Sequence, residues 1–156
     1  MTKFDYEIDD FMCYCQSKKL STRTMRSYEQ TLRLFAKYLE DKKEIKTTKD
    51  VTKDDVKHYI VYLQERGKYT ITSNENSLEL NRPHNRQDYS KPIKNGTINN
   101  YIRNLKVYFN YMDENYLIKE NPVTKIKFLK AQRTKKAFIK DMEFYKLLKN
   151  LDITKY

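Results

Sequence analysis

The chain has 156 residues, enough for one domain and a fragment of a second. It has only 2 Gly and 3 Pro, which disfavours sheet-rich folds and glycine-rich phosphate loops, whereas 14 Tyr and 7 Phe can fill a small helical core. Lys and Arg number 32 against 21 Asp and Glu, a net charge of +11. We therefore expect an anionic partner, with nucleic acid first and an anionic membrane surface second.

Neither export nor membrane insertion is indicated. No apolar run approaches the roughly 18–20 residues that span a bilayer. The N-terminal MTKFDYEIDD is acidic and lacks an apolar signal segment, so a cytoplasmic location is expected. Cys13 and Cys15 form an isolated C-x-C without a second Cys or His pair nearby, which is a poor zinc site. We interpret them as ordinary thiols and expect no metal and no cofactor.

Apolar residues at helical spacing predict a first helix over residues 4–18. Its outer face is acidic, so we do not expect that face to meet a polyanion. A second helix opens at Leu20-Ser21-Thr22, where either Ser21 or Thr22 can provide the N-cap. Its apolar stripe is the strongest in the chain and consists of Met25, Tyr28, Leu32, Phe35 and Leu39.

A second stripe on the same predicted helix is basic. Solvated faces usually mix positive and negative side chains, and this stripe contains no acidic residue. It is typical of an element that lies along or enters a nucleic-acid groove, with solubility as the alternative explanation. Its members are Arg23, Arg26, Gln30, Arg33 and Lys37.

A third helix is predicted to begin after Thr52, which can act as N-cap with Asp55 three residues on as a weak capping box. Gly67 is a plausible stop for it, and its mixed charge indicates a structural role. Residues 68–94 are polar and lack a helical period. They are interpreted as either a small hairpin about residues 73–76 or a mobile loop.

A fourth helix is predicted from Thr97 to Glu114, with Thr97 as N-cap just after Asn95-Gly96. It has two distinct faces. The apolar face consists of Ile98, Ile102, Leu105, Phe109 and Met112, and the polar, basic face of Asn99, Arg103, Lys106 and Asn110. The helix is therefore expected to bury one side and to offer the other side to a partner.

A basic segment follows this helix, after Asn121-Pro122. Residues 123–136 contain no acidic residue and six cations, Lys125, Lys127, Lys130, Arg133, Lys135 and Lys136. Such a segment, neither helix nor core, is typical of a linker that tracks a nucleic-acid backbone, and the alternative is an unstructured tail. Apolar residues from Ile139 to Leu148 then predict a short final helix.

Taken in order, these pieces resemble the N-terminal half of a tyrosine recombinase of the phage and transposon integrase type. The resemblance covers nearly all of the chain but departs from the family at residues 68–94, where the family's loop is usually shorter. It rests on Leu20-Ser21-x-x-Thr24-x-x-x-Tyr28, Val51-Thr52-x-x-Asp55-Val56, Thr97-Ile98 running to Tyr111, Asn121-Pro122, the basic segment, and Phe138-Ile139 leading to Leu147-Leu148.

The resemblance implies an all-α, SAM-like core-binding domain, an orthogonal bundle of four or five helices. It divides the chain into a DNA-binding domain over residues 1–123, a basic interdomain linker over 124–137, and the beginning of a truncated catalytic domain over 138–156. In this family the core-binding domain clamps one side of a DNA duplex, and a C-terminal catalytic domain clamps the other. The implied assembly is a tetramer on DNA, in a bacterial cytoplasm and nucleoid-associated when bound.

The resemblance also implies a set of contacts to double-stranded DNA, carried over from matching positions in the family, because the family's second and fourth helices face the major groove. Of these contacts, Arg23, Arg26 and Arg103 are the candidates for base edges, since a guanidinium matches guanine O6 and N7. The full set is Thr22, Arg23, Arg26, Arg33, Asn95, Thr97, Asn99, Arg103, Lys106, Lys130, Arg133, Lys135 and Lys136.

The family's chemistry uses a tyrosine that attacks the scissile phosphodiester, with arginines and a His or Lys in support. No such constellation is recognisable in the sequence. The first catalytic arginine normally follows a Thr-Gly-x-Arg turn, and the only glycines are Gly67 and Gly96. We therefore expect this chain alone to be inert. The alternatives are a stand-alone helical DNA-binding regulator, which would need to dimerise, and a helical protein-interaction module, whose binding would be insensitive to salt.

Overall fold

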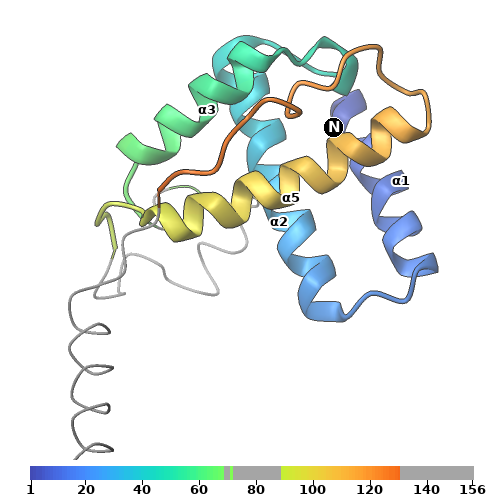
Figure 1. Ribbon diagram of the computed structural model, residues 1–156, viewed down its shortest axis with the longest axis horizontal. Coiled ribbons are helices and arrows are strands. Elements are labelled where there is room, and N and C mark those ends of the chain that lie inside the picture. The colour runs from blue at the N-terminus through green and yellow to red at the C-terminus, as the bar shows by residue number, and fades with distance from the viewer. Residues whose placement is uncertain (69–70, 72–88, 131–156) are drawn as a thin grey trace, which may run out of the picture.

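The computed structural model describes residues 1–68, 71 and 89–130. Within them the protein is helical and contains no strand, which confirms the predicted all-α bundle (Figure 1). The α-helices are α1 (Lys3–Ser17), α2 (Thr22–Tyr38), α3 (Lys53–Glu65) and α5 (Asn95–Glu114); a π-helical turn (Leu39–Lys43) and a 3-10 turn (Thr48–Asp50) connect α2 to α3. The short helix predicted after Ile139 lies outside the described residues.

Side-chain caps fix where three of the helices begin. Ser21, not Thr22, caps α2, because its hydroxyl accepts the Thr24 N–H at 3.2 Å. At α3 the predicted capping box is present: the Asp55 N–H donates to the Thr52 hydroxyl at 3.2 Å, and the Thr52 N–H donates to the Asp55 carboxylate at 2.9 Å. An equivalent capping box, Thr2 with Asp5, begins α1.

The prediction of Thr97 as the N-cap of α5 is wrong. The helix begins two residues earlier, at Asn95, and its N-cap is Lys94, which makes no side-chain capping bond. The Lys94 carbonyl accepts the N–H groups of Thr97 and Ile98 at 3.0 and 3.1 Å. Asn95-Gly96 is a common turn pair, but here it adopts helical backbone and Gly96 has no positive φ.

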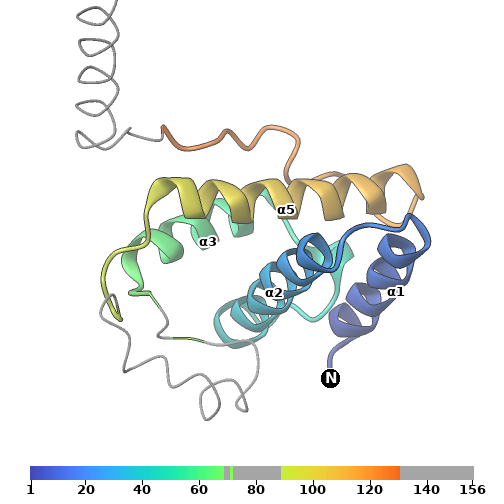
Figure 2. The ribbon, with the colours of Figure 1, turned by 90° about the horizontal axis from the view of Figure 1, so that it is seen from below.

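Helix α5 is the central element of the bundle. It packs across α2 and against α3, while α2 also packs on α1 (Figures 1 and 2). The chain then turns back after α5, and residues 121–130, orange in the figures, run along the side of α5 that faces away from α1 and α2 (Figure 2). The bundle therefore has α1 and α2 on one side of α5 and this returning segment on the other.

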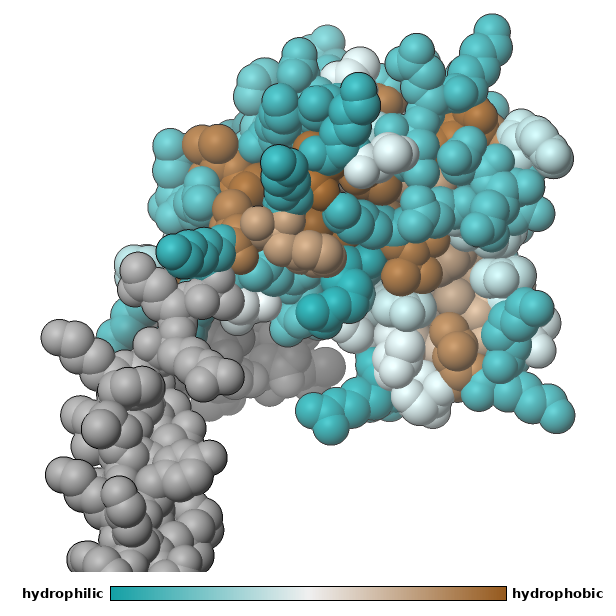
Figure 3. Space-filling model, viewed as in Figure 1, coloured by the Kyte–Doolittle hydropathy of each residue, from teal (hydrophilic) through white to brown (hydrophobic). Residues whose placement is uncertain are grey.

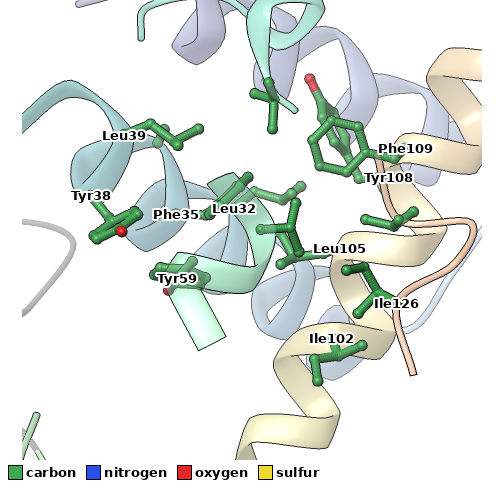
Figure 4. Packing of buried hydrophobic residues seen from close by; sticks show 14 of the residues in the cluster. Leu32, Phe35, Tyr38, Leu39, Tyr59, Ile102, Leu105, Tyr108, Phe109 and Ile126 are labelled. Atoms are coloured by element: carbon green, nitrogen blue, oxygen red, sulfur yellow. The ribbon is translucent and has the colours of Figure 1, made fainter. Parts of the chain in front are cut away.

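The core is rich in aromatic side chains from all four helices. Phe4 and Phe11 of α1, Phe35 of α2, and Tyr108 of α5 are each at most 1% exposed, and Tyr59 of α3 joins them (Figure 4). Their rings lie in contact, with centroids 5.2 Å apart between Phe11 and Tyr108 and 4.8 Å apart between Phe35 and Tyr59. These rings supply the large apolar area expected from the Tyr and Phe content.

The returning segment contributes to this core, contrary to the prediction that the basic segment is neither helix nor core. Val123 and Ile126 are 1% and 4% exposed, and Ile126 lies beside Ile102 and Leu105 of α5 (Figure 4). The packed residues therefore run past the predicted domain boundary at 123. The non-helical backbone expected for this segment is confirmed over residues 126–130.

Two backbone hydrogen bonds close the polar segment between α3 and α5 at its base. Lys68 donates its N–H to the Lys91 carbonyl and accepts the Ser90 N–H, both at 2.8 Å, beside a bridge between Gly67 and Pro92. Helix α3 ends at Glu65, close to the predicted stop. However, Gly67 has no positive φ; it is needed because a Cβ there would lie 2.5 Å from the Ser90 backbone. The predicted hairpin about residues 73–76 lies outside the described residues.

Candidate nucleic-acid interface

The first turns of α2 present exposed cations. Thr22, Arg23 and Arg26 are exposed, and neither arginine makes a hydrogen bond or ion pair with any described residue. Both arginines lie close to the positive end of the helix dipole, where anions are favoured. In Figure 1 this end of α2 extends beyond α5 on the opposite side from residues 121–130. It is therefore available to an approaching phosphate backbone.

Arg33, further along the predicted basic stripe, has partners within the protein. Its Nη1 donates to the Asp5 carbonyl at 3.0 Å and lies 3.3 Å from the Asp5 carboxylate, and its Nη2 pairs with Asp9 and with Glu29. The side chain is 20% exposed. Burial alone would lower the pKa of Arg33, but the hydrogen bond to Asp9 and the charges of the three carboxylates outweigh it and raise the pKa.

These contacts give Arg33 a structural role, because it ties α2 to α1 and compensates the acidic face of α1. A contact from Arg33 to DNA remains a prediction, and it would require the guanidinium to leave its carboxylates. The stripe itself contains no acidic residue, but the fold brings Asp5 and Asp9 of α1 to Arg33, and Glu29 lies one turn before it on α2.

The polar face of α5 meets the returning segment. Asn99 donates from Nδ2 to the Leu129 carbonyl at 2.8 Å and accepts the Leu129 N–H at Oδ1 at 2.7 Å. Asn95 donates from Nδ2 to the Lys130 carbonyl at 3.1 Å, and the Lys106 ammonium lies 5.0 Å from the centroid of the Phe128 ring. Three of the predicted DNA contacts therefore touch the chain's own backbone or side chains.

Two other predicted contacts on α5 remain exposed. Arg103 is exposed and donates from Nη1 to the Asn100 side chain at 2.8 Å, a surface bond that costs little to exchange for another acceptor. Thr97 is exposed in the first turn of the helix. Arg103 is thus the α5 cation that the fold leaves most accessible. Of the remaining predicted residues, Lys130 is exposed, and Arg133, Lys135 and Lys136 lie outside the described residues.

Lysines from three parts of the chain line one shallow groove. Lys53 begins α3, Lys106 lies on α5, and Lys125 and Lys127 come from the returning segment, and Phe128 also lines the groove. None of the four makes an ion pair with a described residue. Teal, hydrophilic side chains cover most of this face (Figure 3). Four uncompensated charges along one groove favour a polyanion such as a phosphate backbone.

Lys53 was missing from the candidates chosen from the sequence. It is the first residue of a helix whose mixed charge indicated a structural role, and only the fold brings it next to Lys106 and the returning segment. Lys125 and Lys127 were recognised as part of the basic segment but were not selected as contacts. The signal that could have found them is the absence of any acidic residue over 123–136.

In a comparison with protein families, residues 8–79 match the model of the phage integrase N-terminal SAM-like domain. Over these residues the chain is similar to a phage integrase N-terminal SAM-like domain. The match confirms the resemblance drawn from the sequence, and it covers α2, α3 and most of α1. Neither the search of curated proteins nor the search of solved structures gave a match.

The SAM-like domain supports an integrase-type DNA-binding role and suggests a tyrosine recombinase as the parent protein. The described residues contain no cluster of His, Cys, Asp and Glu that could hold a metal ion. Among the same residues, no helix combines the length and the hydrophobicity that a membrane crossing requires. The described part of the chain is a helical scaffold with exposed cations, among them Arg23 and Arg26, that make no ion pair within it.

Proposed function

We propose that this chain is the DNA-binding N-terminal portion of a site-specific tyrosine recombinase, which clamps one side of a DNA duplex during recombination or integration. The observation that carries the proposal is the match of residues 8–79 to the phage integrase N-terminal SAM-like domain. The cations at the start of α2 and along the lysine groove, which make no ion pair with any described residue, support it, because phosphate contacts supply a large share of the affinity of such proteins.

The proposal includes two kinds of contact with the duplex. The lysine groove (Lys53, Lys106, Lys125 and Lys127) and Lys130 would meet phosphates and set the position of the duplex. Arg23, Arg26 and Arg103 would reach base edges, because an exposed guanidinium can donate two parallel hydrogen bonds to guanine. Thr22 and Thr97, exposed in the first turns of their helices, would add phosphate contacts.

The rest of the family arrangement belongs to the same proposal. Residues 1–123 would form the core-binding domain, 124–137 the interdomain linker with Arg133, Lys135 and Lys136 on DNA, and 138–156 the beginning of the catalytic domain. The scissile-bond chemistry would then reside in a C-terminal catalytic domain, so this chain alone would bind DNA without cleaving it. The full-length recombinase would act as a tetramer.

The deciding experiment is duplex DNA binding by the chain, measured by fluorescence anisotropy over a series of salt concentrations. We expect the logarithm of the association constant to fall linearly with the logarithm of the salt concentration, with a slope of several units. Each neutralised phosphate contributes about −0.9 to that slope. No binding at low salt, or a flat slope, would contradict the proposal and favour a helical protein-interaction module.

Arg103→Ala tests the orientation of α5 toward the duplex. The variant should lose about 1–3 kcal/mol of binding free energy on duplexes that the wild-type chain selects from a random library, and should relax the preference at one base pair. The matched control is Asn100→Ala, which removes the surface partner of Arg103 and leaves its charge in place. If Arg103→Ala changes neither affinity nor sequence preference, α5 does not face the duplex as proposed.

A further inference from the structure

Asn99 and Leu129 form an amide clasp, a pair of hydrogen bonds between one side-chain amide and both backbone groups of a residue 30 positions further along. The two bonds, 2.8 and 2.7 Å long, have the donor and acceptor arrangement of a hydrogen-bonded pair of residues in an antiparallel sheet. Such a pair fixes the direction of the held backbone as well as its position. Asn99 is half-buried, so competition from water is reduced.

Neighbouring contacts hold the same stretch of backbone on either side of the clasp. Before it, Ile126 is buried in the core and the Phe128 ring lies under the Lys106 ammonium. After it, Asn95 donates to the Lys130 carbonyl. Residues 126–130 are therefore held along α5 although they form no helix, strand or ion pair among the described residues.

We propose that Asn99 is a positioning residue for DNA binding. Its amide clasp fixes the path of the basic segment along α5 and so presents Lys125, Lys127 and Lys130 to the duplex in one register. Asn95, one turn earlier in the helix, supports the clasp through its hydrogen bond to the Lys130 carbonyl. The DNA part of this inference rests on the proposed function, whereas the clasp itself does not.

This role differs from the direct DNA contact that family position implies for Asn99. An asparagine recognises adenine by using its oxygen and an N–H together. Here the oxygen and an N–H are already bonded to Leu129, so the same bidentate recognition would require the clasp to open. The two roles therefore predict different behaviour of an Asn99 variant.

Amide hydrogen exchange at Leu129, followed by NMR in the 156-residue chain without DNA, tests the clasp. Asn99→Ala should speed exchange of the Leu129 N–H by about tenfold or more, because its hydrogen-bond acceptor is lost, while amides in the middle of α5 keep their rates. Asn100→Ala, the same change one position along on an exposed side chain, should leave Leu129 unchanged. Unaltered exchange in Asn99→Ala, or an equal rise in Asn100→Ala, would overturn the clasp. If Asn99→Ala does not fold, Asn99→Ser gives the same test, because its hydroxyl is too short to span both Leu129 groups.

DNA binding by the same variants tests the positioning role. Asn99→Ala should weaken binding several-fold on duplexes selected by the wild-type chain and equally on scrambled duplexes, with an unchanged salt slope, because all cations remain. A loss confined to the selected duplexes would show direct base recognition and overturn the proposal. Unchanged affinity despite faster Leu129 exchange would overturn it too. If the wild-type chain itself does not bind DNA, the proposed function fails, and the exchange measurement still decides the clasp.

Discussion

At the scale of single residues, the contact between α1 and α2 depends on carboxylates gathered around one guanidinium. Asp5 accepts hydrogen bonds from the Thr2 N–H and hydroxyl, at 2.9 and 3.0 Å, and faces Arg33. Burial would raise the pKa of the Asp5 carboxyl, but the hydrogen bonds from Thr2 and the charge of Arg33 outweigh it and lower the pKa. Asp5 therefore caps α1 and joins it to α2 at the same time.

Asp5→Asn should make the fold less stable and less sensitive to acid. Because the folded-state pKa lies below the ordinary value of 3.8, the ionised carboxylate stabilises the fold above that pH, and this contribution is lost as the pH falls through the folded-state pKa. The variant should lose about 1 kcal/mol of unfolding free energy at pH 7 and should lose less than wild type on acidification below about pH 4. Urea unfolding of the variant and of wild type, at pH 7 and again below about pH 4, measures both differences in unfolding free energy.

Asp10→Asn is the control for this measurement, since Asp10 is an exposed carboxylate of the same helix without an ion pair among the described residues. Its unfolding free energy should stay within about 0.5 kcal/mol of wild type. An Asp5→Asn variant with the same loss of stability on acidification as wild type would contradict the role of this carboxylate.

Substitution of each of the two glycines by alanine should change the unfolding free energy in opposite directions. Gly96 lies in the first turn of α5 with helical backbone and open space where a Cβ would be, so Gly96→Ala should raise the unfolding free energy by about 0.5–1 kcal/mol. Gly67→Ala should lower it by about 1–3 kcal/mol, because the new Cβ would lie 2.5 Å from the Ser90 backbone. Urea unfolding of both variants checks this, and each serves as the control for the other. A shift of the same sign in both would contradict the explanation.

At the scale of elements, a buried polar network sets the crossing of α2 and α5. Asn104, 7% exposed, approaches the Ser27 hydroxyl at 3.0 Å and the Thr31 hydroxyl at 2.9 Å with its Nδ2. Thr31 in turn donates to the Ser27 carbonyl at 2.9 Å. Since the partners of Asn104 are specific atoms on α2, a shift of one helix along the other would leave its amide unpaired in the interior.

Asn104→Ala should therefore lower the unfolding free energy by about 1–3 kcal/mol, through the lost hydrogen bonds and the space left at the crossing. Asn100→Ala, on the exposed side of the same helix, should change it by no more than about 0.5 kcal/mol. Thermal or urea unfolding of both variants provides the comparison. Equal effects of the two substitutions would mean that Asn104 is not a special contact of α2 and α5.

Local features of the sequence were sufficient to predict the helices. Apolar spacing gave α1, α2, α3 and α5, and the Thr52 and Asp55 pair gave the start of α3, because capping depends on residues only three apart. Thr97 was wrongly predicted as the N-cap because Asn95-Gly96 is a pair common in turns, whereas in the structure both residues belong to the first turn of α5. The partner of Asn99 and the α1 partners of Arg33 lie 24 to 30 residues away, and a helical period carries no information about such distant contacts.

At the scale of the whole molecule, the candidate DNA surface arises from the fold and not from one motif. Lys53, Lys106, Lys125 and Lys127 come from two helices and the returning segment, and they line one groove. The sequence could show the excess of positive charge, +11, and the acid-free stretch over 123–136. It could not show which cations lie together, because that depends on how residues 121–130 return along α5 (Figure 2).

If these lysines act as one phosphate-binding surface, removing two of them should change the salt dependence of DNA binding. The double variant Lys125→Gln, Lys127→Gln should reduce the slope of log K against log salt by up to about 2, and should weaken binding to all duplexes alike, because phosphates carry no sequence information. Anisotropy titrations over a salt series measure both quantities.

The control removes the same charge elsewhere. Lys3 and Lys42 are exposed and do not line the groove, so Lys3→Gln, Lys42→Gln should leave the slope unchanged while lowering the net charge equally. If both double variants lose affinity to the same extent, binding responds to net charge alone and the groove has no specific role. A slope reduced only in the groove variant would mean that the returning segment and α5 together form the surface that meets the phosphate backbone.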